Sequence, residues 1–174
     1  MVAAPIRVGR ESLTRTRGRV RAVIVNSGNA NCATGMPVVR ACRTICDEVG
    51  RLLHVRGEEV FPSSTGIIGI PLPTQLILSK LPELVSRTAA TDDAFRQFAQ
   101  AILTTDTRAK LAAASFNLGN KKATIAGVAK GAGMIHPQLA TMLVYIFRRR
   151  GRKSIRVKTM SKARLRRELQ LHFD

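Results

Sequence analysis

The chain has 174 residues, of which 45% are hydrophobic, and its formal net charge is +18. This length and composition suffice for one folded domain with a core, and they exclude a collagen-like or a disordered chain. No apolar run approaches the ~20 residues of a membrane-spanning helix, and the N-terminus lacks the apolar stretch of a signal peptide, so we expect a cytoplasmic protein without membrane association.

The positive charge is unevenly distributed. Residues 148–174 hold eleven Lys or Arg against two acids, whereas residues 1–147 hold 18 against nine. The sequence therefore predicts a moderately basic domain over 1–147 and a basic tail over 148–174. Such a tail can bind polyanions through charge alone. It offers only Phe173 for stacking on bases, which argues against sequence-selective binding of nucleic acid.

The first half of the chain predicts a strand, a helix and a polar loop. The β-branched run over 20–25 predicts a buried strand that ends in a turn at 26–29. Apolar residues recur at helical spacing over 37–54, so we expect a helix with one apolar face there. Residues 62–66, Pro-Ser-Ser-Thr-Gly, predict a loop before an apolar stretch at 67–70.

The second half predicts helices over 74–87 and 91–103, and Thr91 is the expected N-cap of the second. A loop at 104–107 closes that helix. Alternation over 122–128 and the apolar run over 142–147 predict two strands. The fold class is therefore α/β or α+β, with helices packed on a mixed sheet.

No residue cluster predicts a metal site. Cys42 and Cys46 are four residues apart on the apolar face of the predicted helix, where two core thiols are favoured over a metal site. With Cys32 they form an odd set, so we expect free thiols. His54 and His136 have no acidic or cysteine partner nearby in sequence. The Gly-rich segments lack the spacing of a phosphate-binding fingerprint.

Four segments dense in hydroxyl and small residues remain. They are NSGNAN at 26–31, SSTG at 63–66, TTDT at 104–107 and KGAGMIHPQLAT at 130–141. In sequence and in order they resemble the glutamate N-acetyltransferase family of arginine biosynthesis, also called the ornithine acetyltransferase family. The resemblance covers about residues 2–146, and it implies an N-terminal-nucleophile-like fold, here incomplete.

The resemblance implies that the chain cuts itself between Ala140 and Thr141. Thr141 then becomes the N-terminal nucleophile that carries the acetyl group. This role suits an N-terminal threonine, because its α-amino group, with a pKa near ~8, can act as the base for its own hydroxyl. The small side chain of Ala140 leaves room for the attack that cuts the chain.

The resemblance also assigns the residues around the nucleophile. Thr65 and Gly66 match the positions that stabilise the oxyanion formed during acyl transfer. Thr104 and Lys130 match substrate-binding positions, together with Thr141. The implied reaction moves an acetyl group from N2-acetylornithine to glutamate without a cofactor, and the use of acetyl-CoA stays open. The two cleaved chains would assemble as a heterotetramer.

Two alternatives follow from the departures from the family. Its members are longer, and their second chain contributes substrate ligands that no position here matches. The chain can therefore be an inactive fragment from a truncated or frameshifted gene copy. The basic tail alternatively favours a nucleic-acid binder. A reading frame lost just downstream in the DNA would support the fragment.

Overall fold

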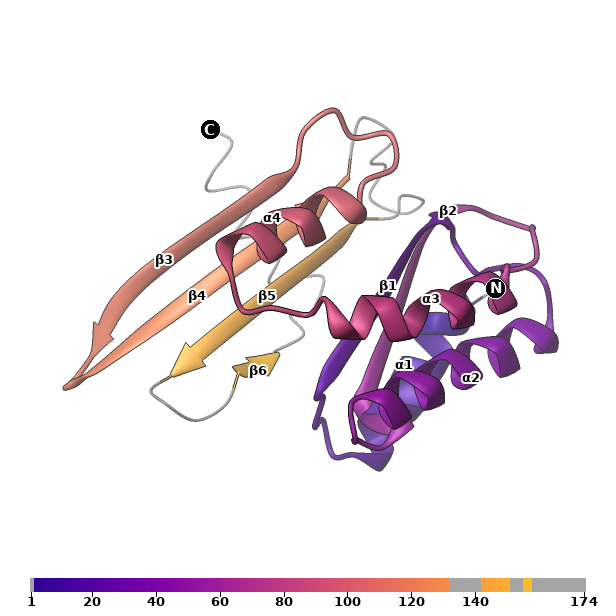
Figure 1. The fold of residues 1–174 in the computed structure, drawn as a ribbon, viewed down its shortest axis with the longest axis horizontal. Helices are drawn as coiled ribbons and strands as arrows, with labels where there is room; N and C mark the ends of the chain where they lie inside the picture. The colour runs from indigo at the N-terminus through magenta and orange to yellow at the C-terminus, as the bar shows by residue number, and fades with distance from the viewer. Residues whose placement is uncertain (1, 132–141, 151–154, 158–174) are drawn as a thin grey trace. The chain divides into compact units, whose positions relative to one another are not determined.

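The computed structural model describes residues 2–131, 142–150 and 155–157 (Figure 1). The chain divides into two compact units. The first comprises Met1–Ala109 and Lys130–Leu143, and the second comprises Lys110–Ala129 and Val144–Asp174. The chain therefore leaves the first unit and returns to it just before the segment that contains the predicted cleavage position.

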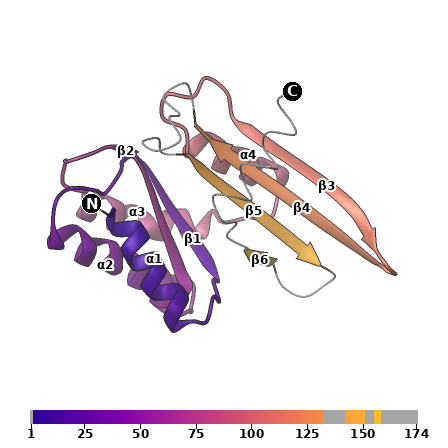
Figure 2. The same cartoon turned by 180° about the vertical axis from the view of Figure 1, so that it is seen from behind.

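A parallel pair of strands forms the sheet of the first unit. Strands β1 (Ala22–Asn29) and β2 (Val60–Ile67) pair from Ala22↔Val60 to Gly28↔Gly66. Parallel neighbours need a crossover connection, and helix α2 (Met36–Leu52) with the short 3-10 helix η1 (Gly57–Glu59) provides it. Helix α1 (Ala4–Arg15) precedes β1, whereas α3 (Thr74–Ser86) and α4 (Asp92–Ala101) follow β2. Both views show α1, α2 and α3 beside this strand pair (Figures 1 and 2).

The core of the first unit is built mainly from one face of α2. This confirms the amphipathic helix expected over 37–54, because its apolar residues are buried at helical spacing. The expected N-cap of α4 is also confirmed, since the Thr91 Oγ1 accepts a hydrogen bond from the Ala94 N–H at 3.1 Å. The buried cluster comprises Ala4, Val8, Val38, Val39, Cys42, Ile45, Cys46, Val49, Val60, Leu72 and Leu81.

The second unit is a four-stranded sheet in the order β3-β4-β5-β6. Its strands are β3 (Lys110–Leu118), β4 (Lys121–Lys130), β5 (Leu143–Arg150) and β6 (Ile155–Val157). A two-residue turn joins β3 to β4, with Leu118 opposite Lys121 and Gly119 at φ +60°. The strands expected over 122–128 and 142–147 are confirmed as β4 and β5, and the mixed α/β fold class is confirmed with them.

Two predictions of irregular structure were wrong. The turn expected at 26–29 is the second half of β1, and the loop expected at 62–66 lies within β2. Their registers run Asn26↔Ser64 and Ser27↔Thr65, so each polar segment satisfies the backbone groups of the other. Tertiary pairing thus overrides the turn preference of Asn, Ser and Gly.

Candidate functional site

Thr65 lies at the carboxyl end of β2 and is almost completely buried, with 1% of its surface exposed. Among the described residues, its hydroxyl has no hydrogen-bond partner. A buried hydroxyl without a partner costs about 1–3 kcal/mol, so it is rare in native structures unless a ligand or water uses it. The Thr65 hydroxyl is therefore able to donate to a negatively charged oxygen.

Gly66 is held against the backbone of β1. Its φ is +132°, and a Cβ atom at this position would lie 2.2 Å from the carbonyl carbon of Gly28 and 2.5 Å from the Asn29 nitrogen. No side chain fits there without separating the strands. The end of β2 is consequently fixed directly beside the NSGNAN segment, with Thr65 opposite Ser27.

Lys130 is a buried lysine at the end of β4, with 5% of its surface exposed. Its Nζ donates a hydrogen bond to the Thr104 Oγ1 at 2.8 Å. Among the described residues Lys130 forms no ion pair. A buried ammonium group that donates to one hydroxyl can donate a further hydrogen bond to a carboxylate. The pair predicted for substrate binding is thus in direct contact.

The loop at 103–106 links the two halves of the predicted site. On one side, the Ser27 Oγ donates to the Leu103 carbonyl oxygen at 2.6 Å, and Ser27 is the strand partner of Thr65. On the other side, the Gly131 N–H donates to the Asp106 Oδ1 at 2.8 Å. The sequence assigned no role to Ser27 or Asp106, although both lie inside the quoted segments.

Ala140 and Thr141 lie outside the described residues. The nucleophile and the position of the cut therefore stay predictions from the sequence. The last described residue before them is Gly131, which is buried and bound to Asp106. The structure accordingly describes Thr65 and Gly66, which are predicted to stabilise the oxyanion, and the contact between Lys130 and Thr104.

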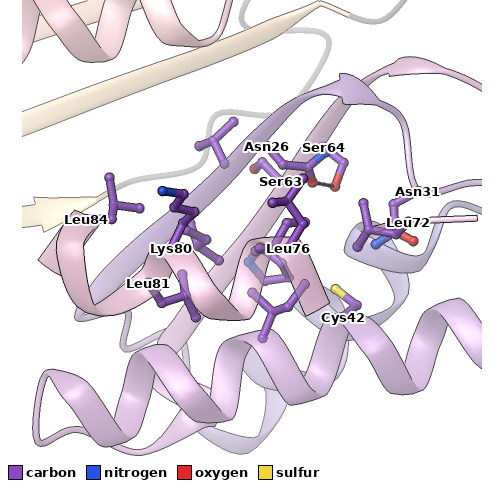
Figure 3. Close-up of a pocket in the computed structure, with 15 residues that line it drawn as sticks. Asn26, Asn31, Cys42, Ser63, Ser64, Leu72, Leu76, Lys80, Leu81 and Leu84 are labelled. Atoms are coloured by element: carbon purple, nitrogen blue, oxygen red, sulfur yellow. Dashed lines mark hydrogen bonds between the residues drawn. The ribbon is translucent and has the colours of Figure 1, made fainter. Parts of the chain in front are cut away.

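A separate cavity of about 230 Å³ lies close to the same segments (Figure 3). Its polar wall includes Asn26 and Ser64, whose side chains form a hydrogen bond of 2.6 Å between the Ser64 Oγ and the Asn26 Oδ1. Its other wall is formed largely by leucines of α3, including Leu76 and Leu84. The predicted site residues do not line it.

The cysteines and the described histidine form no second site. Cys42 and Cys46 are buried free thiols in the core, as expected. The hydrogen bond with Cys42 and burial together raise the pKa of the Cys46 thiol. Within the described ranges, no group of three His, Cys, Asp or Glu could hold a metal ion. His136 falls outside these ranges, and none of the helices within them could cross a membrane.

The chain is similar to proteins of arginine biosynthesis. A model of the ArgJ family matches residues 1–166. The arginine biosynthesis bifunctional protein ArgJ of Methylococcus capsulatus is 42% identical over 144 residues, which are 83% of this chain and 34% of that protein. The protein of the same name from Gloeobacter violaceus is 43% identical over 144 residues, with 35% of its length covered. The chain thus spans about a third of the length of these curated relatives.

Two solved structures are similar as well. The crystal structure of ArgJ from Bacillus halodurans matches 81% of this chain and 71% of its own, with a TM-score of 0.71 and 36% identity. The structure of ornithine acetyltransferase from Mycobacterium tuberculosis, solved as a complex with ornithine, has a TM-score of 0.67 and 30% identity. It matches 82% of this chain and 72% of its own.

Proposed function

Because the chain belongs to the ArgJ family, we propose that its site serves acetyl transfer from N2-acetylornithine to glutamate, with Thr141 as the residue that carries the acetyl group. The contact between buried Lys130 and Thr104 carries this proposal. A lysine without an acidic partner among the described residues is suited to the carboxylate that both substrates share.

The proposed reaction has two acyl-transfer steps. The Thr141 hydroxyl attacks the acetyl carbonyl of acetylornithine, its proton passes to the free α-amino group, and the ornithine amine leaves with a proton. The amine of glutamate then attacks the resulting ester and releases Thr141. Each step passes through an oxyanion, toward which the Thr65 hydroxyl and the Gly66 N–H are the proposed donors. No cofactor takes part.

We also propose that the 174 residues alone complete only part of this site. The chain spans a third of its curated relatives, so most of the relatives' residues have no counterpart in it. Acyl transfer depends on positioning as well as on a nucleophile. We therefore expect no turnover from the purified chain, and a complete site only in an assembly that supplies the remaining residues, such as the heterotetramer implied by the resemblance.

A pair of assays tests this proposal. The first measures N-acetylglutamate formation by the 174-residue chain. The second uses a chimera in which the matched residues of this chain replace their counterparts in the full-length Methylococcus capsulatus relative. The chimera should be active, and Lys130→Ala and Thr65→Val should each reduce kcat/KM about a hundredfold or more. The 174-residue chain should be inactive.

Two results would contradict the proposal. If Lys130→Ala and Thr65→Val leave the kcat/KM of an active chimera unchanged, neither residue belongs to the site. Turnover by the 174-residue chain that disappears with Thr141→Ala would show that its site is complete. Thr65→Val is a clean probe, because it removes the hydroxyl and its cost of burial while nearly keeping the side-chain shape, and it should not lower the stability.

One observation favours polyanion binding as a second function. Strands β5 and β6 are antiparallel, and their register sets Arg148 opposite Arg156. Both positions belong to the basic tail over 148–174, which holds eleven Lys or Arg. We propose that the basic tail over 148–174 binds nucleic acid through its positive charge alone. Affinity for duplex DNA should fall steeply between 50 and 200 mM salt, on the order of tenfold or more, and be indifferent to sequence. Sequence-selective binding that persists at high salt would contradict this charge-only mode.

A further inference from the structure

We propose that Asp106 is a positioning residue, whose carboxylate holds the Lys130–Gly131 segment in the orientation that the site needs. The inference rests on the proposed function, since the segment it holds contains the substrate-binding lysine. The Asp106 Oδ1 accepts the Gly131 N–H at 2.8 Å. This distance is within the usual range of an N–H···O hydrogen bond, so the Asp106 oxygen is a well-placed acceptor.

Two adjacent residues at the end of β4 contact two residues of the same loop. Lys130 reaches Thr104 through its side chain, and Gly131 reaches Asp106 through its backbone. The two bonds differ in kind, because the first ends on a flexible side chain and the second fixes the main chain. The Asp106 bond therefore holds the backbone directly after Lys130, where β4 ends, and the Thr104 bond directs the ammonium group of Lys130.

The same loop is anchored on its other side. The Ser27 Oγ donates to the Leu103 carbonyl oxygen at 2.6 Å, and Ser27 pairs with Thr65 in the β1–β2 register. Asp106 is thus the last link of a connection that begins beside Thr65 and ends at the backbone of Gly131. Without that link, the segment would be tied to this loop through the Lys130 side chain and Thr104.

The contact with the Gly131 N–H requires an acceptor oxygen at the position of the Asp106 Oδ1 more than it requires a negative charge. Asp106→Asn retains an oxygen that can accept the Gly131 N–H, whereas Asp106→Ala removes it. A misplacement of about 1 Å can cost on the order of a hundredfold in rate. The alanine variant should therefore lose function and the asparagine variant should recover most of it, which a purely charge-based role would not allow.

Hydrogen exchange followed by NMR tests the contact in the full 174-residue chain. The Gly131 amide should exchange at least about tenfold faster in Asp106→Ala than in the unchanged chain, and at nearly the unchanged rate in Asp106→Asn. Asp93→Ala is the matched control, because Asp93 is an exposed acid in the first turn of α4. An unchanged Gly131 rate in Asp106→Ala would overturn the inference. So would faster exchange throughout β1 and β2, since that would mean a general folding role.

The chimera tests the functional part. Asp106→Ala should lower kcat/KM about ten- to a hundredfold, with Asp106→Asn within a few-fold of the unchanged chimera. If Gly131 loses protection while acetyl transfer stays unchanged, Asp106 positions nothing that the reaction uses and the inference is wrong. If the unchanged chimera has no activity, the proposed function fails, and the exchange rates still decide whether Asp106 holds the segment.

Discussion

Gly66 and Gly69 both have positive φ angles, but only Gly66 is crowded. A Cβ atom at Gly69 would meet nothing within 4 Å, whereas one at Gly66 would overlap the backbone of Gly28. Gly69→Ala should therefore cost only about 1–2 kcal/mol of unfolding free energy, the price of the backbone conformation. Gly66→Ala should cost about 3 kcal/mol or more, because β1 and β2 must also separate. Urea unfolding compares them, and equal losses would contradict the close packing.

Glu59 makes the stability depend on pH. Burial on its own would raise the pKa of this carboxyl, but the Arg56 N–H and the positive charges of Arg19, Arg56 and Arg21 outweigh burial, so its pKa is lowered from its ordinary 4.5. The Arg19 Nε lies 2.7 Å from the Glu59 Oε1. A lowered folded-state pKa adds stability above the unfolded-state value, and this stability is lost as the pH falls through the folded-state value.

Glu59→Gln should therefore be less stable than the unchanged chain at pH 7, and the difference should shrink as the pH falls below 4.5. Urea midpoints measured from pH 7 to pH 3 check this. Glu83→Gln is the control, because the ion pairs of Glu83 in the described part of the chain, with Lys80 and Arg87, are exposed and contribute little. A stability gap that is independent of pH would mean that Glu59 acts through packing.

The sequence could select candidate site residues, but it could not predict the contacts between them. The family resemblance selected Thr104 and Lys130, and the structure joins their side chains. The Ser27–Leu103 bond spans 76 positions along the chain, so no local pattern could indicate it. The proposed role of Asp106 was missed for the same reason, because it depends on a backbone N–H that is 25 positions away.

Helix α3 contains both a buried and an exposed leucine. Substitutions at the two positions can therefore separate the effect of burial on stability from the effect of residue type. Leu81 is 1% exposed and packs in the core, whereas Leu76 is 61% exposed. Leu81→Ala should destabilise the first unit by about 2–5 kcal/mol, because it removes buried methyl groups and leaves a cavity. Leu76→Ala should cost less than about 0.5 kcal/mol. Urea unfolding measures both, and a large loss at Leu76 would mean that this face is covered in solution.

Complete helices and strands were predicted where a single pattern of apolar residues dominated the segment. Helix α2 has a continuous apolar face, whereas α1 buries small residues such as Ala4, Gly9 and Ser12, which give a weak helical pattern. Strand β3 begins Lys-Leu-Ala-Ala-Ala, and alanine favours a helix. Pairing with β4 over its whole length makes it a strand. The sequence missed α1 and β3 because tertiary contacts decide both.

The charge composition and the structure divide the chain at different positions. The charge pattern changes at 148, yet β5 runs from Leu143 to Arg150 across that position. The charge composition indicates which residues can contact solvent or a polyanion. The division into two compact units follows instead from which strands pair. We retain the basic tail over 148–174 as a proposal about charge. Its first residues nevertheless belong to a strand of the second unit.

The bond between Ala140 and Thr141 is the predicted position of the cut. Self-cleavage requires the Thr141 hydroxyl against the Ala140 carbonyl and an oxyanion held by Thr65 and Gly66, and a misplacement of about 1 Å can cost a hundredfold. The chain spans only a third of its curated relatives, so most of their residues have no counterpart here. We therefore expect slow or absent cleavage, and intact-mass spectrometry should find a single chain of 19.0 kDa. Prompt release of a fragment that begins at Thr141, abolished by Thr141→Ala, would show instead that these 174 residues align the hydroxyl by themselves.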